Sequence, residues 1–327
     1  MKDVCKRKEE PEIVIIGASI LDVLAYPADE EVFRTGSSPA EDIRLSVGGD
    51  ALNEATVLAR LGMKVLLETV IGSGKAGKFI LDHCRDCGIL LPADCVREDF
   101  STGINVVLVS RDGSRHFLTN PHGSLRRLTL QDIHMPFPQS AKIVCFASIF
   151  VFPEIGPKEL EVIFRTAKEQ GKIICADMTK RKKNETVEDL AGALKYVDYL
   201  IPNDEEAMLL TGEESVEAVA GRLREAGAGT VVIKCGDRGC YLDSADGKCW
   251  IPAEKNVKCI DTTGAGDSFA AGFLYALSRG RSLRECAEYG NRCGAKAVSV
   301  VGASDWAEKG DRKKSTVPRR PESRTLF

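Results

Sequence analysis

The sequence has few aromatic residues, almost no net charge and no long apolar run. Aromatic residues make up 6% of its 327 residues, and the formal net charge is −3. Such a charge gives no whole-protein attraction to nucleic acid or to an anionic membrane. No apolar run reaches the roughly 18 residues that a membrane-spanning helix needs, and residues 1–11 lack the apolar core of an export signal. We therefore expect a cytoplasmic protein with no nucleic-acid partner and no membrane association.

Cysteine is plentiful, but the spacing of the twelve cysteines is too irregular for a disulfide framework. Several stand inside apolar runs, such as Cys145 in KIVCFA and Cys175 in KIICAD, where a thiol behaves as a small apolar side chain. With no export signal, reduced thiols are expected. Cys84 and Cys87 beside His83 have metal-like spacing, yet no second pair completes the about four ligands of a zinc site.

Short β-branched runs alternate with longer segments of helical periodicity. The expected strands are 12–16, 64–71, 142–147, 172–177, 199–203 and 230–235. The expected helices are 53–61, 78–86, 157–169, 204–211 and 216–226. Strands that are apolar almost throughout are typical of a sheet covered on both faces. The alternation predicts an α/β fold with a doubly wound, mainly parallel central sheet flanked by helices.

Two stretches, 25–47 and 100–120, interrupt this rhythm. The second contains GINVVLVS and RHFLT on either side of an Asp112-Gly113 turn, the pattern of a β-hairpin. We predict a small protruding β-sheet, built from about 25–47 and 100–124, as a lid over the carboxyl ends of the main strands, where α/β ligands bind. Residues 1–304 are expected to form one domain, and the basic segment 305–327 a disordered tail.

The segment 72–79 fits two phosphate-binding patterns. Gly72, Gly74 and Gly77 spell GxGxxG between an expected strand and an expected helix, and with Lys78 they also give GxxxxGK. Phe79 replaces the Ser or Thr that would hold Mg²⁺, and another strand and helix precede the segment. We interpret it as a structural turn between strand and helix.

A second glycine-bearing segment, DTTGAGDSFAAGF at 261–273, has clearer chemistry. Gly264 and Gly266 allow successive N–H groups to converge on an anion, and the helical pattern of 268–278 follows at once. A helix N-terminus offers N–H donors and the positive end of its dipole to a phosphate. Asp267 at this terminus either caps the helix or accepts a proton from an attacking hydroxyl while the loop stabilises a transferring phosphoryl group.

Other polar groups stand where strands end or helices begin. They are Asp22, Gly49 and Asn53 in the first part of the chain, and Asn203 to Glu206 and TVVIKCGDRG in the second. Together with these groups, GGDALNEATVLARLG and DTTGAGDSFAAGF resemble the two signatures of the PfkB, or ribokinase-like, family of carbohydrate kinases. The resemblance covers about residues 12 to 304.

The resemblance implies an ATP-dependent kinase in which Asp267 is the catalytic base. Gly264, Ala265 and Gly266 would form the anion hole, and Asp22, Gly49 and Asn53 would hold substrate hydroxyls. Asn203 would lie at the nucleotide and Glu206 would organise Mg²⁺ through water. These roles are implied by the family's motifs at these positions.

The remaining implied residues surround the nucleotide and a cation. Lys234, Gly236 and Gly239 would meet the nucleotide, Asn291 would lie near the adenine, and Asp177 and Lys180 would lie near the phosphates. A monovalent-cation site, suited to K⁺, would use the residues Asp261, Thr263, Ala297 and Gly302. The family also suggests a homodimer formed through the lid edge.

The substrate is open at this point. A sugar or sugar acid is the first hypothesis, and a nucleoside or cyclitol is the second, with Phe100, Phe117 and His122 as a wall for a base. A third hypothesis is a pseudokinase that binds ligand without turnover. Ile20 and Asp50 stand where ribokinases proper carry Asn and Lys, so ribose is not favoured. Residues 73–75 also lack the family's usual acidic residues.

Overall fold

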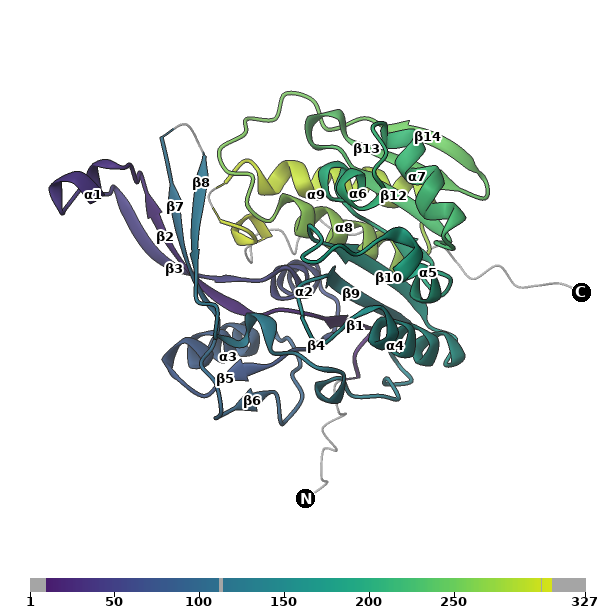
Figure 1. Cartoon of the computed structure of the whole chain (residues 1–327), viewed down its shortest axis with the longest axis horizontal. Coiled ribbons are helices and arrows are strands. Elements are labelled where there is room, and N and C mark those ends of the chain that lie inside the picture. The colour runs from purple at the N-terminus through teal and green to yellow at the C-terminus, as the bar shows by residue number, and fades with distance from the viewer. Residues whose placement is uncertain (1–9, 112–113, 301, 308–327) are drawn as a thin grey trace, which may run out of the picture.

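A mainly parallel sheet of eight strands forms the centre of the protein (Figure 1). The computed structural model describes residues 10–111, 114–300 and 302–307. The strand order is β14-β13-β12-β11-β10-β9-β1-β4. The strands are β1 (Ile13–Ile16), β4 (Val65–Glu68), β9 (Ile143–Ile149), β10 (Ile173–Met178), β11 (Tyr199–Leu200), β12 (Thr230–Lys234), β13 (Cys240–Ser244) and β14 (Gly247–Ile251). Neighbouring strands pair in parallel from β4 to β12, and the two remaining pairs, β12–β13 and β13–β14, are antiparallel.

Helices cover both faces of this sheet, because alternate residues of each strand are buried on opposite sides. Ile13 and Ile15 pack with α2 and α8, whereas Val14 and Ile16 lie in the core formed with α4, α5, α6 and α7. The helices are α2 (Asp50–Arg60), α3 (Lys75–Cys87), α4 (Pro157–Glu169), α5 (Val187–Leu194), α6 (Asp204–Thr211), α7 (Val216–Glu225), α8 (Ala265–Ser278) and α9 (Leu283–Ala297). The predicted doubly wound α/β fold is confirmed; β13, β14, α5 and α9 are not among the expected elements.

A second sheet of four strands stands away from the main body (Figure 1). Its order is β3-β2-β7-β8, with strands β2 (Ile20–Tyr26), β3 (Asp42–Gly48), β7 (Ile104–Val109) and β8 (Arg115–Thr119). A short helix, α1 (Glu31–Thr35), joins β2 to β3. The expected hairpin is present, since β7 and β8 pair antiparallel; its Asp112-Gly113 turn lies outside the described residues. This sheet is the lid, and it begins at Ile20, earlier than expected.

The GxGxxG segment forms a tight strand-to-helix turn. The short strand β5 (Ile71–Gly72) pairs with β6 (Val96–Arg97), and α3 begins at Lys75. A Cβ at Gly77 would lie 1.8 Å from the carbonyl oxygen of Gly72, so only glycine lets the helix approach the strand this closely. Short 3₁₀ helices are Ser124–Arg126, Leu130–Asp132, Gly236–Arg238 and Asp305–Ala307. In the described ranges, no helix has the length and apolarity to cross a membrane.

Residues 308–327, most of the expected tail, lie outside the described residues, as do residues 1–9. Every cysteine within the described ranges is a free thiol. His83 Nε2 lies 2.9 Å from Thr56 Oγ1 and 3.7 Å from Cys87 Sγ, between α2 and α3. The histidine and Cys87 therefore serve packing between these two helices.

Candidate active site

The carboxylate of Asp267 lies where the N-termini of α2 and α8 meet. Its Oδ2 accepts a hydrogen bond of 2.7 Å from Asn53 Nδ2 in the first turn of α2. Gly264 precedes α8 in a left-handed conformation, φ 68°, and a Cβ there would lie 2.5 Å from the carbonyl oxygen of Ala303. Glycine is therefore required for the chain to enter α8 in this way. Asp267 therefore stands in the first turn of α8, directly after this glycine-bearing loop.

The environment of Asp267 favours its protonated form more than water does. Burial, and then the negative charge of Asp50, raise the pKa of the Asp267 carboxyl well above its ordinary value. The hydrogen bond from Asn53 and the charge of Lys234 act in the opposite direction. A carboxylate with a raised pKa binds a proton more strongly, which is the property of a general base.

Lys234, at the carboxyl end of β12, forms an ion pair with Asp177 at the end of β10. A Cβ at Gly266 would lie 3.4 Å from Lys234 Nζ, so this ammonium lies next to the 264–266 loop. Burial disfavours the charged lysine, but Asp177 holds the pKa of Lys234 above its ordinary value. Burial also raises the pKa of Asp177 to about 6, although Lys234 opposes that shift.

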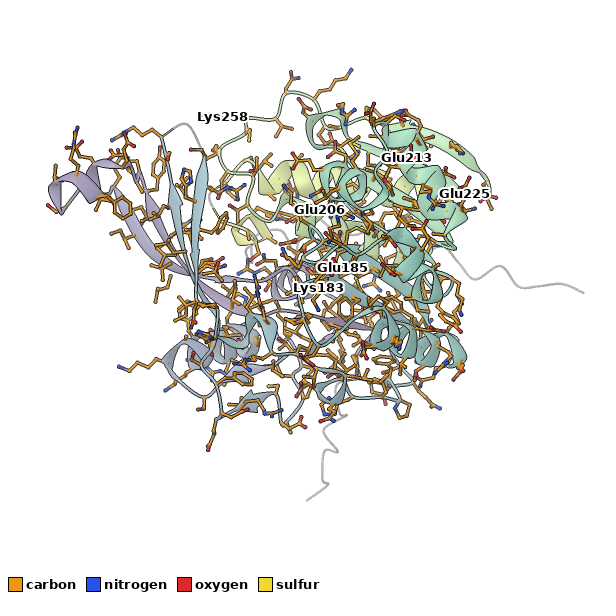
Figure 2. The ribbon with its side chains drawn as sticks, in the orientation of Figure 1. Lys183, Glu185, Glu206, Glu213, Glu225 and Lys258 are labelled. Carbon is orange, nitrogen blue, oxygen red and sulfur yellow. The ribbon has the colours of Figure 1, made fainter. Side chains whose placement is uncertain are left out.

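Glu206 lies in the first turn of α6, within electrostatic reach of Asp177 and Lys234, and near the middle of the molecule in Figure 2. Its backbone N–H donates a 2.8 Å hydrogen bond to Asn203 Oδ1, which caps the helix. Burial, followed by the charge of Asp177, raises the pKa of Glu206 to about 7. Glu54, in the middle of α2, is fully buried, and burial together with the charges of Asp177 and Asp267 raises its pKa well above normal.

Acidic groups thus outnumber basic ones in this cluster. The carboxyls that influence one another are Asp50, Glu54, Asp177, Glu206 and Asp267, and the ammonium among them is that of Lys234. Oxygen donors with excess negative charge fit Mg²⁺, a hard cation. In this set, Asp177 pairs with Lys234, and Glu206 is within electrostatic reach of both.

The three predicted substrate residues also converge. Asp22 projects from the lid strand β2 and packs against Gly48, where a Cβ would lie 2.1 Å from Asp22 Oδ2. Gly49 has φ 91°, and a Cβ there would meet the carbonyl oxygen of Ala18 at 2.5 Å. Burial raises the pKa of Asp22 to about 6. A hydrogen bond from Asn105 lowers this pKa, and the negative charge of Asp50 raises it further. Asp22, Asp50, Asn53 and Asp267 therefore border one site between lid and sheet.

The predicted nucleotide residues border a neighbouring region. Gly239 has φ 92°, and a Cβ there would lie 2.1 Å from the carbonyl oxygen of Ile251. Asn291 on α9 donates to the carbonyl oxygens of Ile251 and Pro252 at 3.2 and 3.0 Å. Gly236 and Gly239 flank the turn after β12, so this turn, the chain after β14 and Asn291 lie together. Lys180 instead pairs with Glu205 at 3.2 Å, on the exposed side of α6.

Of the four residues predicted for a monovalent cation, Thr263 and Gly302 donate to the carboxylate of a third, Asp261, whose own N–H donates to the carbonyl oxygen of Val298, next to Ala297. Asp261 Oδ1 accepts hydrogen bonds from Thr263 N at 2.9 Å and Thr263 Oγ1 at 2.6 Å, and Oδ2 accepts one from Gly302 N at 3.0 Å. The Ala297 carbonyl accepts from Val300 N at 3.3 Å. Burial acts to raise the pKa of Asp261, but the hydrogen bonds from Thr263 and Gly302 outweigh it, so the pKa of this carboxyl is lowered.

A lid residue that the sequence analysis missed also reaches this loop. Arg115, the first residue of β8, donates to Thr262 Oγ1 and Thr263 Oγ1, and its Nη1 lies 3.7 Å from Asp261 Oδ1. Strand alternation could have indicated it, because Arg115 pairs with Val109 and so shares a sheet face with Asn105 and Asp22. Glu54 was likewise not expected as a member of the site.

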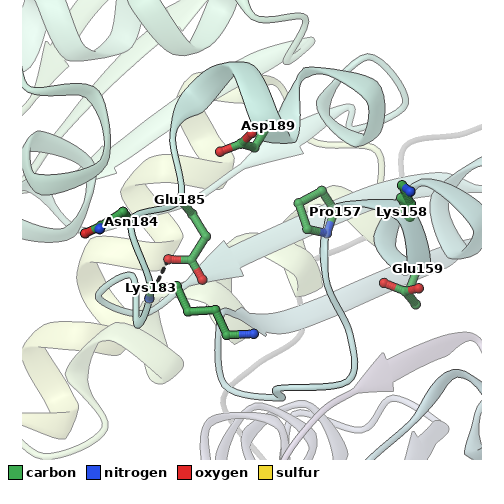
Figure 3. Close-up of a pocket in the computed structure, with 7 residues that line it drawn as sticks. All are labelled: Pro157, Lys158, Glu159, Lys183, Asn184, Glu185 and Asp189. Carbon is green, nitrogen blue, oxygen red and sulfur yellow. Dashed lines mark hydrogen bonds between the residues drawn. The ribbon is translucent and has the colours of Figure 1, made fainter.

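A surface hollow elsewhere lies between the N-terminus of α4 and the segment before α5 (Figure 3). Its lining residues are Pro157, Lys158, Glu159, Lys183, Asn184, Glu185 and Asp189. None of the predicted site residues is among them. The candidate active site is therefore the separate group of residues around Asp267, which borders the lid.

Comparison with known proteins shows the family to which the chain belongs. The chain belongs to the pfkB family of carbohydrate kinases, whose profile matches residues 10–309. The aminoimidazole riboside kinase of Salmonella typhimurium is 29% identical over 78% of this chain and 83% of its own length. The ribokinase of Haemophilus influenzae is 27% identical over 86% of this chain and 88% of its own length.

Solved structures show the same fold. The aminoimidazole riboside kinase of Salmonella enterica, complexed with aminoimidazole riboside and an ATP analogue, superposes with a TM-score of 0.73. It is 25% identical, and the match covers 92% of this chain and 97% of the other. The family resemblance inferred from the sequence is confirmed.

Proposed function

We propose that this protein transfers the γ-phosphoryl group of ATP to a hydroxyl of a small sugar or sugar acid, with Asp267 as general base. The observation that carries the proposal is the placement of Asp267. It is hydrogen-bonded to Asn53 at the start of one helix and stands at the N-terminus of another, beside Lys234. A proton acceptor and an anion-binding helix terminus meet there, as phosphoryl transfer to an alcohol requires.

In this mechanism Asp22 and Asn53 hold the substrate hydroxyls. Gly49 has no side chain, so the substrate can lie close to its backbone. Asp267 takes the proton of the attacking hydroxyl as this oxygen bonds to the γ-phosphorus. The bond from that phosphorus to the β–γ bridging oxygen breaks, and ADP leaves. The N–H groups of Gly264, Ala265 and Gly266, with the dipole of α8, stabilise the negative charge on the transferring group. The lid over the site limits access of water, which would otherwise accept the phosphoryl group.

The nucleotide and ion roles follow the same arrangement. Asn203, Lys234, Gly236, Gly239 and Asn291 are proposed to contact the nucleotide, and Glu206, near Asp177, to hold Mg²⁺ through water. Mg²⁺, when bound, neutralises charge on the phosphates. The residues Asp261, Thr263, Ala297 and Gly302 are proposed to take K⁺, next to the guanidinium of Arg115. The enzyme is proposed to act in the cytoplasm, with residues 1–304 as one kinase domain.

A nucleoside is the second candidate substrate, and one feature of the lid favours it. Phe117 pairs with Val107 and therefore lies on the same lid face as Asp22, where its side chain is 54% exposed. Leu24, Val107 and Val109 form a small apolar cluster on that face. An aromatic and apolar surface of this kind can pack against a base.

The test is a coupled ADP-release assay with Mg-ATP and K⁺ across hexoses, pentoses, sugar acids, nucleosides and inositols. Asp267→Asn should lower kcat by about 10²- to 10⁴-fold on the substrate that the wild type uses, with little change in KM. Asp82→Asn, on the exposed face of α3, is the matched control and should leave turnover unchanged. Equal kcat in Asp267→Asn and wild type would remove Asp267 from the mechanism. Substrate binding without turnover in the wild type would identify a pseudokinase instead.

A further inference from the structure

A group of buried hydrogen-bond acceptors in the candidate site has no partner among the residues that the structure describes. They are Ser19 Oγ, Asp22 Oδ1, Asn53 Oδ1 and Asn105 Oδ1. Ser19 is 1% exposed and Asn53 is 5% exposed, so bulk water does not satisfy them. A buried polar atom without a partner is costly and calls for a ligand or an ordered water.

These acceptors come from four places that the fold brings to one side of the site. Ser19 lies between β1 and β2, Asp22 and Asn105 are register partners on β2 and β7, and Asn53 is in the first turn of α2. Asn53 uses its amide N–H group for Asp267, which leaves its oxygen for another donor. Carboxylate and amide oxygens only accept hydrogen bonds. The three oxygens of Asp22, Asn53 and Asn105 therefore need a group that donates a hydrogen bond. The Ser19 hydroxyl can either donate or accept one.

Asp50 adds negative charge to the same place. It is the first residue of α2, and its Oδ2 accepts a hydrogen bond from Ser148 Oγ at the end of β9. Its charge contributes to the raised pKa values of both Asp22 and Asp267. Asp50 is therefore within electrostatic reach of the residue proposed to hold the substrate and of the residue proposed to deprotonate it.

The neighbouring cationic side chains are paired with carboxylates of the protein. Lys234 pairs with Asp177, Arg115 Nη1 is 3.7 Å from Asp261, and Arg44 Nε is 3.6 Å from Asp42. A ligand carboxylate would therefore have to compete with these groups for a positive partner. It would also bring a third negative charge close to Asp22 and Asp50, a juxtaposition that costs affinity in a partly buried site.

We infer that the substrate pocket bordered by Ser19, Asp22, Asp50, Asn53 and Asn105 selects a donor-rich substrate without negative charge, and accepts an amino-bearing sugar in preference to a sugar acid. This inference rests on the proposed kinase function and narrows its substrate class. Hydroxyl and ammonium groups donate to the free oxygens, and an ammonium is in addition attracted by Asp50. Specificity arises here from repulsion of the acid as well as attraction of the amine.

The experiment compares kcat/KM for hexose, hexosamine and hexonate, and for the corresponding pentose series, with Mg-ATP at fixed ionic strength. The acids should be used about 100-fold less well than the neutral parents, an expected cost of like charges at close range. Thermal-shift titration of the protein with the same compounds, without ATP, should give the same order of affinity. This second readout does not depend on turnover.

Asp50→Asn is the informative variant, because asparagine keeps the size of the side chain and a hydrogen-bond partner for Ser148. It should bring the acid-to-neutral ratio of kcat/KM about tenfold closer to one and lower the preference for the amine. Asp82→Asn makes the same charge change on α3 and should leave both ratios as in the wild type.

Two outcomes separate this inference from the proposed function. Turnover that is fastest on a sugar acid, or identical ratios in Asp50→Asn and Asp82→Asn, would overturn the inference while the kinase function stands. Absence of turnover on every compound, with no thermal shift, would overturn both.

Discussion

At the scale of single residues, the site depends on a carboxyl group that is held partly desolvated. Burial and the nearby charge of Asp50 favour the protonated form of the Asp267 carboxyl. The hydrogen bond from Asn53 and the charge of Lys234 favour the ionised form. The balance gives a carboxyl with a higher proton affinity than aspartate has in water. Glu206 and Asp22 show the same tendency, with pKa values raised to about 7 and about 6 by burial.

These raised pKa values predict an acid limb in the pH dependence. In the proposed mechanism Asp267 accepts a proton, Glu206 holds Mg²⁺ through water and Asp22 accepts from substrate hydroxyls, and each carboxyl must be deprotonated to do so. Raised pKa values therefore mean that activity is lost as pH falls from neutral into the range where these carboxyls gain protons. We expect kcat/KM to fall as pH is lowered through the window of about 7 to about 6 defined by Glu206 and Asp22. A pH–rate profile at saturating Mg²⁺ measures this.

The same profile for Asp50→Asn should show its acid limb at lower pH, because the charge of Asp50 contributes to the raised pKa of Asp267 and Asp22. A limb that stays in place in this variant, or a wild-type profile that is flat down to the ordinary aspartate range, would contradict the assignment.

At the scale of elements, the lid contacts the catalytic loop through Arg115. The residue stands at the start of β8, yet its guanidinium donates to Thr262 and Thr263, which directly precede Gly264. The side chain is 21% exposed, so water screens this contact only partly. We expect a hydrogen-bonded charge at this point to couple the position of the lid to the shape of the proposed anion hole.

Arg115→Ala should therefore lower kcat more than it raises KM for the sugar. Hydrogen bonds to charged groups are worth about 1.5–3 kcal/mol, which corresponds to a loss of roughly 10- to 100-fold. Steady-state kinetics with varied sugar and varied ATP measure the separate changes in kcat and KM. Arg111→Ala is the matched control, since Arg111 belongs to the same hairpin and pairs with Glu41 at 3.0 Å, away from the catalytic loop. Equal effects of the two variants would show that Arg115 only stabilises the lid.

At the scale of the whole molecule, the lid has an apolar face turned away from the site. The face opposite to Asp22 carries Ile43, Leu45 and Leu118, which are 69%, 53% and 59% exposed. Val23, Ala25, Val106 and Leu108 lie on that same face between them. An exposed apolar sheet face of this kind is typical of a protein–protein interface.

We therefore propose that two copies pair through their lids to form a homodimer, and expect sedimentation equilibrium to give twice the chain mass. Leu45→Asp should shift the protein to monomer, because a charge in the middle of an apolar interface is costly. Leu209→Asp, at a 43%-exposed leucine on α6, is the matched control and should remain dimeric. A wild-type protein that stays monomeric at high micromolar concentration would rule out this role of the lid face.

The amino-acid sequence determined much of the main domain, because its signals are local. Apolar runs such as those of β1, β9 and β10 and the glycine pattern of 261–273 involve neighbours in the chain, whose spacing sets strand, helix and turn. The same pattern indicated the family, which is confirmed, and it is the basis of the roles proposed for Asp267 and the 264–266 loop. The helices α5 and α9 and the β13–β14 hairpin were not predicted, although local signals mark them. Thr186 and Ser282 form capping boxes at the starts of α5 and α9, and Asp246-Gly247 stands at the turn of the hairpin.

Only the tertiary structure decided which of these residues meet. Asn53 and Asp267 are hydrogen-bonded although 214 positions separate them, and Arg115 reaches Thr263 across 148 positions. The influence of Asp50 on Asp22 and Asp267, the burial of Glu54 and the unpartnered oxygens of Asn53 and Asn105 likewise arise from packing. Desolvation and charge–charge interaction depend on distance in space and not along the chain, so no local pattern contains them.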